Sequence, residues 1–115
     1  MKLKIHKDGK EVSYMLLTKL PNGDIEIEFS KTDPKYRNRG FASLLLTKAK
    51  VMADKMHKNL VTVIDPDNSG GLTYQQEFEW LVRHGFKPVR KYEFEKHNFK
   101  NVMIYHNVEK EKNKK

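Results

Sequence analysis

The sequence contains no cysteine. This absence excludes disulfide bonds, thiolate catalysis and cysteine-ligated zinc or iron–sulfur centres, and it agrees with a reducing compartment. Long apolar runs are also lacking, because no segment approaches the ~20 apolar residues that a membrane-spanning helix needs. The first ten residues, MKLKIHKDGK, have none of the apolar core of a signal peptide. We therefore expect a soluble, cytoplasmic protein that does not bind membranes.

Patterns typical of metal sites are missing as well. The histidines show no ligand spacing, standing at positions 6, 57, 84, 97 and 106. Residues 65–76, DPDNSGGLTYQQ, resemble a calcium loop, but the twelfth position is Gln76 instead of a bidentate glutamate, and a strand is expected before it. We expect no metal. His84, directly before Gly85, is expected to be a cation stabilised by a helix dipole.

Positive charge dominates what is present. The chain has 115 residues, of which 33% are charged, and its net charge is +8. This length suits one compact domain, which we place at residues 1–108, followed by the basic tail 109–115. The charge favours phosphates, nucleic acid or acidic proteins as partners. Residues 91–100 carry acids as well as bases, so nucleic acid remains open as a partner but is not favoured.

The first thirty residues have the pattern of three strands joined by tight turns. Asp8-Gly9 and Asn22-Gly23 are strong hairpin signals. The third strand, residues 24–30, alternates strictly between apolar and polar residues. This alternation predicts that one face carries Ile25, Ile27 and Phe29, and the other Glu26, Glu28 and Ser30.

The remaining pattern predicts two helices between further strands. A helix of about 17 residues should follow Gly40 and end near residues 57–59. Residues 59–65, NLVTVID, suit a strand buried on both faces in a parallel pairing. Thr73 and Gln76 form a capping box for a second helix that Gly85 ends. Two strands close the chain, within residues 86–96 and 101–108. The expected class is α+β, in the order strand, strand, strand, helix, strand, helix, strand, strand.

The segment KYRNRGFASLLL, residues 35–46, joins a basic turn, a glycine and the start of the first helix. The first amides of a helix lack intrahelical partners, and the helix dipole adds positive charge there. Such a turn can hold a pyrophosphate. An ordinary basic turn before a helix fits this stretch equally well, so the surrounding order has to decide.

That order resembles the GNAT superfamily of N-acetyltransferases. RNRGFA (37–42) matches the pattern Q/R-x-x-G-x-G/A, the family's acetyl-coenzyme A signature, and WLVRHGFKPV (80–89) resembles its second helix and Gly-Phe exit. The resemblance covers residues 11–108. It implies a GNAT-like fold, with a mixed, mostly antiparallel sheet of about six strands and two main helices. It also implies acetyl transfer from acetyl-coenzyme A to an unidentified amine, by direct attack on the thioester.

The resemblance also implies which residues bind the coenzyme. The backbone of Ser30, Lys31 and Thr32 would run beside the pantetheine arm like an added strand. Side chains of Lys35, Arg37 and Arg39 would meet the phosphates. The amides that would hold the pyrophosphate belong to Arg37, Asn38, Arg39, Gly40, Phe41, Ala42 and Ser43.

Two departures from the family concern the acceptor and the acid. Members usually have a strand and two helices before this point that shape the acceptor site. In this chain the wall of the acceptor site would come from a partner subunit or from residues 87–108. The first alternative means that the protein could be a homodimer. The tyrosine that protonates the leaving thiolate is replaced by Leu81. Tyr74 is a candidate substitute, although core packing explains it as well.

A general base is needed if the acceptor is an ammonium. Glu26 and Glu28 are the candidates, and Glu26 falls where some protein-acetylating members keep a glutamate base. Both carboxylates could equally be solvent-facing residues of an alternating strand. The departures leave a second function class open, which is a non-catalytic module of the same fold that binds coenzyme A, nucleic acid or protein.

Overall fold

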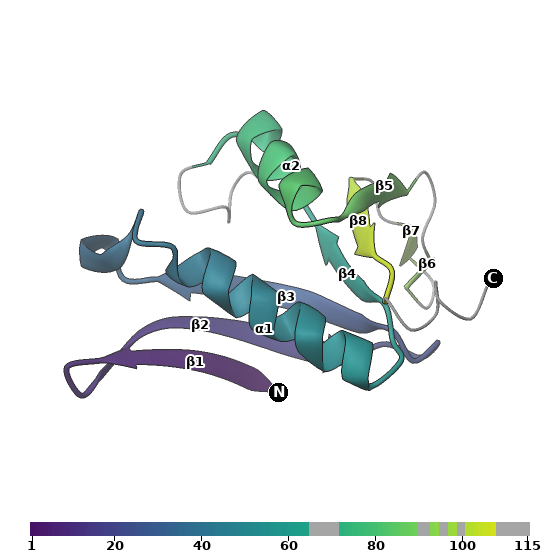
Figure 1. Cartoon of the computed structure of the whole chain (residues 1–115). Coiled ribbons are helices and arrows are strands. Elements are labelled where there is room, and N and C mark those ends of the chain that lie inside the picture. The colour runs from purple at the N-terminus through teal and green to yellow at the C-terminus, as the bar shows by residue number, and fades with distance from the viewer. Residues whose placement is uncertain (65–71, 90–92, 95–96, 99–100, 108–115) are drawn as a thin grey trace.

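A computed structural model describes residues 1–64, 72–89, 93–94, 97–98 and 101–107. It is an α+β structure in the predicted order (Figure 1). Its elements are β1 (Lys2–Lys7), β2 (Lys10–Lys19), β3 (Ile25–Thr32), the 3₁₀ helix η1 (Pro34–Tyr36), α1 (Phe41–Lys55), β4 (Leu60–Val63), α2 (Tyr74–Arg83), β5 (Lys87–Val89), β6 (Glu93–Phe94), β7 (His97–Asn98) and β8 (Val102–Tyr105).

Six strands form one mixed sheet, in the order β1-β2-β3-β4-β8-β5. The pairing of β3 with β4 is parallel, as predicted, and the other pairs are antiparallel. Of the strand predicted within residues 86–96, the structure shows β5 at Lys87–Val89, while residues 90–92 and 95–96 lie outside the described residues. Beyond β5, β6 pairs with β7 in a separate two-stranded sheet.

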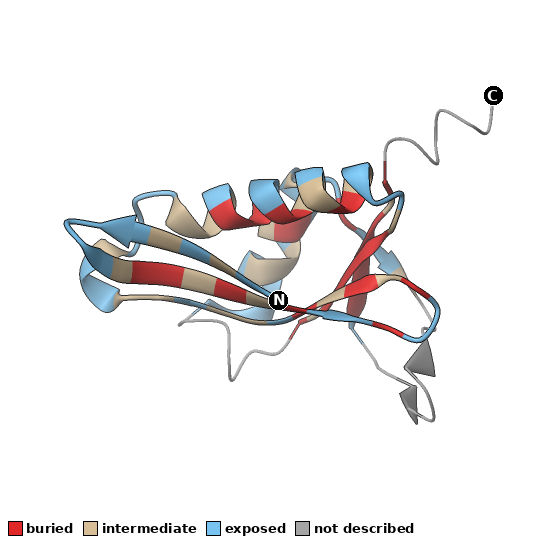
Figure 2. Ribbon diagram, turned by 90° about the horizontal axis from the view of Figure 1, so that it is seen from below, coloured by how far each residue is buried: buried red, intermediate tan, exposed pale blue. Residues whose placement is uncertain are grey.

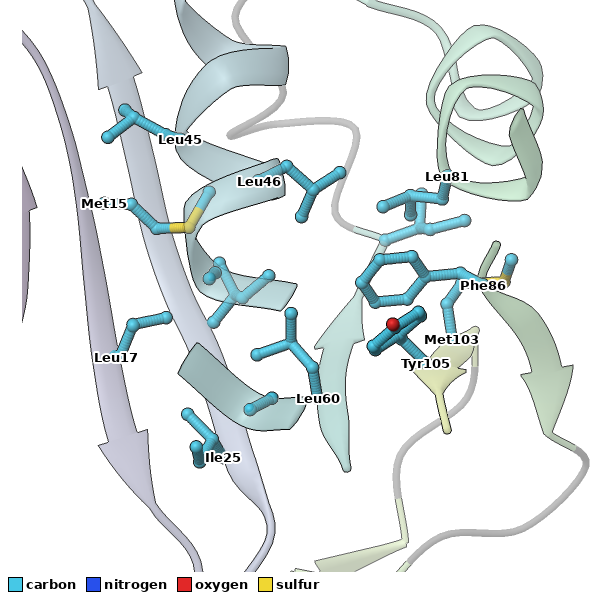
Figure 3. Close-up of a cluster of buried hydrophobic side chains, with 14 residues drawn as sticks. Met15, Leu17, Ile25, Leu45, Leu46, Leu60, Leu81, Phe86, Met103 and Tyr105 are labelled. Atoms are coloured by element: carbon cyan, nitrogen blue, oxygen red, sulfur yellow. The ribbon is translucent and has the colours of Figure 1, made fainter. Parts of the chain in front are cut away.

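Both helices pack on one face of the sheet. Side chains from α1 and α2 share one apolar core with β2, β3, β4 and β8 (Figures 2 and 3). Leu46 of α1 and Leu81 of α2 both belong to this cluster, together with Phe86 and Tyr105. The opposite face of the β4–β8–β5 half carries a second buried cluster that contains Leu20, Val61, Val102 and Ile104.

The helix ends follow the local signals in the sequence. α1 starts after Gly40, whose φ is +84°, and stops at Lys55, two residues before the predicted range. Thr73 and Gln76 form the predicted capping box of α2. Gly85 has φ +88°, the left-handed conformation predicted at the end of this helix.

A β-bulge at Glu28 changes the predicted faces of β3. Leu17 lies opposite Ile27 and Leu16 lies opposite Phe29, so Glu28 is an extra residue on β3. Because one extra residue reverses the alternation, the prediction of strict alternation is wrong beyond Ile27. Phe29 turns to the face away from α1, where its ring centroid lies 5.9 Å from that of Tyr14. Ser30 lies opposite Met15, on the α1 side.

Candidate functional site

A cleft of about 570 Å³ lies where β3 and β4 diverge. The two strands pair only at Ile25–Ile27 with Leu60–Thr62. β3 then continues to Thr32 beside β2 alone, as Figure 1 shows. The turn before α1, the first turn of α1 and the inner side of α2 complete the walls.

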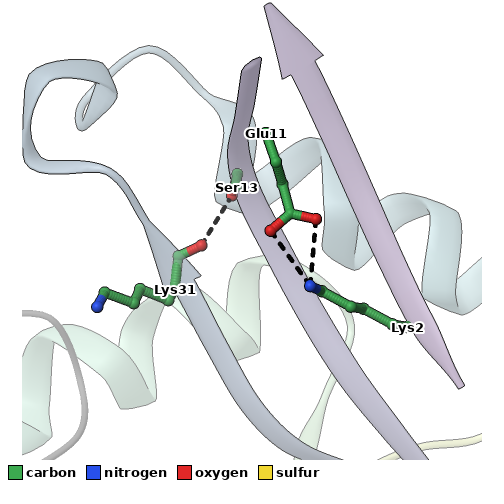
Figure 4. Close-up of polar contacts among 4 residues, drawn as sticks. All are labelled: Lys2, Glu11, Ser13 and Lys31. Carbon is green, nitrogen blue, oxygen red and sulfur yellow. Dashed lines mark hydrogen bonds and ion pairs between the residues drawn. The ribbon is translucent and has the colours of Figure 1, made fainter.

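The free edge of β3 presents alternate backbone groups to this cleft. The amide of Asp33 donates to the carbonyl of Val12 at 2.8 Å, so it points toward β2. Amides alternate along a strand, which directs those of Thr32 and Ser30 to the cleft edge. The Ser13 hydroxyl donates to the Lys31 carbonyl at 3.2 Å, which agrees with this direction (Figure 4). The side chain of Arg37 reaches the carbonyl of Thr32, with Nε at 3.4 Å.

The N-terminus of α1 opens into the same cleft. Its N-cap is Gly40, which has no side chain to cap the helix, and the first helical bond runs from the Leu44 amide to the Gly40 carbonyl at 2.9 Å. The amides of Phe41, Ala42 and Ser43 therefore have no acceptor within the helix. In α2, by contrast, the Thr73 side chain accepts from the Gln76 amide at 3.2 Å. The N-terminal amides of α2 are therefore capped by a side chain of the chain itself, whereas those of α1 have no side-chain cap.

The turn before α1 contains two left-handed residues, Asn38 with φ 63° and Gly40 with φ 84°. Nothing lies within 4 Å of a Cβ built on Gly40, so glycine is required there by its φ and not by close packing. The Arg39 guanidinium lies 5.2 Å from the Tyr36 ring centroid. Arg39 is not among the residues that line the cleft, whereas Arg37 is.

The structure brings the other predicted coenzyme-binding residues together around this cleft. These are Ser30, Lys31, Thr32, Arg37, Asn38, Gly40, Phe41, Ala42 and Ser43. They come from two segments that are separated by η1. The clustering is the geometry expected of a single elongated ligand that contacts a strand edge and a helix N-terminus.

Of the three candidate catalytic residues, only Glu28 lines the cleft. It is exposed and lies at the bulge. Glu26 is half-buried on the face of the sheet away from α1. Its pKa is raised from the ordinary value, mainly by burial and also by the nearby charge of Glu28. The bulge separates the two carboxylates, so they do not share one regular face.

Tyr74 lies outside the lining of the cleft. It is 38% exposed and stacks on Phe78 with 6.2 Å between ring centroids. Leu81 lines the cleft and is 2% exposed. An apolar side chain therefore stands at the position where the resemblance to the GNAT superfamily would imply a tyrosine acid.

Trp80, Ser43 and His84 form a contact that sequence reasoning missed. The Trp80 Nε1–H donates to Ser43 Oγ at 3.1 Å, and His84 Nε2 lies 3.3 Å from the same oxygen. Trp80 lines the cleft together with Glu77, one helical turn earlier. The spacing of residues 77, 80, 81 and 84 on one helical face was the signal that could have revealed this contact.

The expectation that His84 is a cation is wrong. Burial lowers its pKa from the ordinary 6.5, and the charges of Lys50 and Arg83 lower it further. A pKa below the ordinary 6.5 makes the neutral imidazole the main form at pH 7. A neutral imidazole can accept a hydrogen bond from the Ser43 hydroxyl.

Among the described residues, no group of three or more acidic or histidine side chains could hold a metal ion. Residues 65–71, which carry most of the calcium-like loop, lie outside the described residues. No helix in the described part of the chain is long and apolar enough to cross a membrane.

Comparison with known proteins relates this architecture to acetyltransferases. No protein-family model and no curated protein sequence matches the chain. The anti-CRISPR protein AcrVA5 has a similar structure, with a TM-score of 0.65 and 12% identity over 90% of this chain and 97% of that one. The *Escherichia coli* ribosomal-protein-S18-alanine N-acetyltransferase gives a TM-score of 0.66 at 15% identity, over 90% of this chain and 65% of that one.

A third similar structure is the PaiA N-acetyltransferase of *Thermoplasma acidophilum*, in complex with coenzyme A. Its TM-score is 0.67 at 18% identity, over 92% of this chain and 60% of that one. The chain thus spans less than two thirds of the length of these two acetyltransferases. Other similar structures are acetyltransferases of the GNAT family. The protein has the GNAT fold, which confirms the prediction made from RNRGFA and the order of the elements.

Proposed function

We propose that the protein is an N-acetyltransferase that uses acetyl-coenzyme A. The observation that carries this proposal is one cleft in which an uncapped helix N-terminus lies beside an unpaired strand edge. The GNAT fold supports the proposal, and two structures of this fold, from *Thermoplasma acidophilum* and *Bacillus subtilis*, contain coenzyme A.

The residues around the cleft fit the coenzyme in both charge and hydrogen bonding. The open amides of Phe41, Ala42 and Ser43 suit a pyrophosphate, because amides and dipole both favour an anion there. Arg37 adds a full positive charge at the same end. Backbone groups of Ser30 and Thr32 suit the amides of the pantetheine arm, as an added strand does. Lys35 and Arg39 remain predicted contacts of the outer phosphates.

The thioester supplies an activated acetyl group. In the proposed reaction the amine nitrogen forms a bond to the acetyl carbon, the carbon–sulfur bond breaks, and coenzyme A leaves as the thiol or thiolate. Only the neutral amine attacks, so an ammonium must first lose a proton. We assign this proton to the Glu28 carboxylate, because Glu28 lines the cleft and Glu26 does not. With Leu81 at the acid position, the thiol must leave without help from that residue, which a pKa of about 8.5 permits.

A carboxylate placed in the proposed pyrophosphate site tests coenzyme binding. Ala42 is the second residue of α1, and Gln75 is the second residue of α2. In both helices the dipole stabilises an aspartate at this position. Ala42→Asp should retain the fold and weaken coenzyme A by about 10- to 100-fold, because like charges near 4 Å repel by up to about 4 kcal/mol. Gln75→Asp on α2 should bind normally. Calorimetry measures both affinities. Equal affinities would contradict the proposal that the N-terminus of α1 binds the pyrophosphate.

A second function, coenzyme binding without catalysis, is favoured by Leu81 alone. The two functions differ in thiol release from acetyl-coenzyme A in the presence of a lysine peptide, a polyamine or an aminoglycoside. Turnover with any of these acceptors supports the enzyme. Tight binding with no thiol release from the whole set supports the non-catalytic module.

A further inference from the structure

The sheet face away from both helices carries a cluster of aromatic and lysine side chains. Strand register places Lys4 opposite Tyr14 and Tyr14 opposite Lys31, in one row across β1, β2 and β3. The next row contains Lys2, Leu16 and Phe29 in the same way. We call these six residues the sheet-face patch. Because α1 and α2 pack on the other face, neither helix covers it (Figure 2).

The patch is continuous with the proposed acetyl-transfer cleft. Phe29 and Lys31 belong to the patch and also line the cleft. The bulge at Glu28 makes this connection, because it turns Phe29 away from the α1 side. A smaller hollow of about 270 Å³ lies at the other end of the patch, between Tyr14, Lys31 and Pro34. Its lining also includes Glu11 and Asp33, and each of these carboxylates forms an ion pair with a lysine. A chain lying across the patch could therefore reach the cleft with one side chain and the hollow with another.

The polar groups of the patch favour a polypeptide over nucleic acid. Lys2 Nζ lies 4.5 Å from the Tyr14 ring centroid, so an ammonium covers the surface on which a base would stack. The same nitrogen is 3.1 Å from a Glu11 carboxylate oxygen (Figure 4). Glu28 adds negative charge where the patch meets the cleft. A polyanion would meet repulsion there, whereas an ammonium at Glu28 and acidic groups near Lys4 and Lys31 would both be attracted.

Lys4 and Lys31 carry the charge that can select the partner. Both are exposed, and no described residue forms an ion pair with either of them. Tyr14, Leu16 and Phe29 are half-buried between them. An apolar centre with lysines beside it matches a segment that combines apolar and acidic side chains.

We propose that the sheet-face patch docks the acceptor, and that the acceptor is a polypeptide whose reactive amine is flanked by acidic residues. This inference rests on the proposed acetyl transfer. It names the substrate class as a protein amine instead of a small free amine, since the wall of the cleft at Phe29 and Lys31 continues onto a sheet face that neither helix covers.

The experiment compares two fluorescent lysine peptides, one with acidic and one with basic flanking residues, on the coenzyme A-bound protein. The test variant is Lys4→Glu, and the control is Lys48→Glu, an equal charge change on the exposed side of α1. Wild type should prefer the acidic peptide. Lys4→Glu should weaken that peptide by about fivefold and strengthen the basic one, as exposed charge pairs do. Lys48→Glu should change neither.

Fluorescence anisotropy measures peptide binding without any acetyl transfer. The proposed docking surface and the proposed reaction are therefore tested separately. Equal effects of the two variants, or no preference between the peptides, would overturn the docking surface even if thiol is released. Displacement of the acidic peptide by a single-stranded oligonucleotide, with the same loss in Lys4→Glu, would overturn it in favour of nucleic acid. Absence of coenzyme A binding would overturn the proposed function instead.

Discussion

At the scale of single residues, His84 shows how neighbours from another helix decide a charge. Its place at the end of α2 favours a cation. Burial against α1 and the positive charges of Lys50 and Arg83 favour the neutral form more strongly. The Ser43 hydroxyl then has a donor in Trp80 and an acceptor in His84. A protonated His84 could only donate, so acid should weaken this contact.

The lowered pKa of His84 should therefore contribute stability that is lost as the pH falls through 6.5. Near and below pH 6.5, His84 binds more protons in the unfolded state than in the folded state. The free energy of unfolding therefore rises with pH. Solvent screening keeps the effect below about 1 kcal/mol, because the side chain is partly exposed. Urea unfolding at pH 7.5 and 5.5 measures it. His84→Gln should reduce the pH dependence. The same pH dependence in wild type and in His84→Gln would contradict the assignment.

At the scale of elements, the sequence predicts features that depend on neighbouring residues. The capping box of α2 and the left-handed Gly85 at its end depend only on neighbouring residues, and both were predicted correctly. The bulge at Glu28 depends on pairing with β2, so a regular alternation could not reveal it. The contact between Trp80 and Ser43 joins residues 37 positions apart. The local pattern thus predicted the strand-edge and turn residues that line the cleft, but not the wall that α2 contributes.

The bulge predicts different outcomes for two single-residue deletions in β3. Deleting Glu28 joins Ile27 to Phe29 and keeps every later side chain on its present face, so we expect a folded protein. Deleting Glu26 instead pulls Ile25 out of the core and should cost about 2–5 kcal/mol. Thermal unfolding compares the two. If both deletions destabilise equally, the register of β3 is wrong.

The Glu28 deletion also separates binding from chemistry. The shortened chain should still bind coenzyme A through α1, but it lacks the carboxylate that we assign as the base. Glu28→Gln, which keeps the bulge, should lose acetyl transfer to a similar degree at pH 7 and recover it as the pH rises and the amine deprotonates. An unchanged kcat/KM in Glu28→Gln would contradict the assignment of Glu28 as the general base.

At the scale of the whole molecule, the cleft divides the sheet into two halves. β1, β2 and β3 lie on one side, and β4, β8 and β5 on the other. Only three residue pairs join the halves in the sheet, between β3 and β4. The Trp80–Ser43 hydrogen bond joins them again through the helices. A ligand in the cleft would contact both halves, so its binding should stabilise the complete fold.

Coenzyme A at about 100 times its dissociation constant should add about 2.7 kcal/mol to the free energy of unfolding. For a domain of this size that corresponds to a rise in Tm of roughly 10 °C. Gln75→Asp should show the same rise, and Ala42→Asp at most about half of it at equal coenzyme concentration. The single tryptophan of the chain, Trp80, lines the cleft, so its fluorescence should change over the same titration. A Tm rise that Ala42→Asp retains in full would place the coenzyme elsewhere.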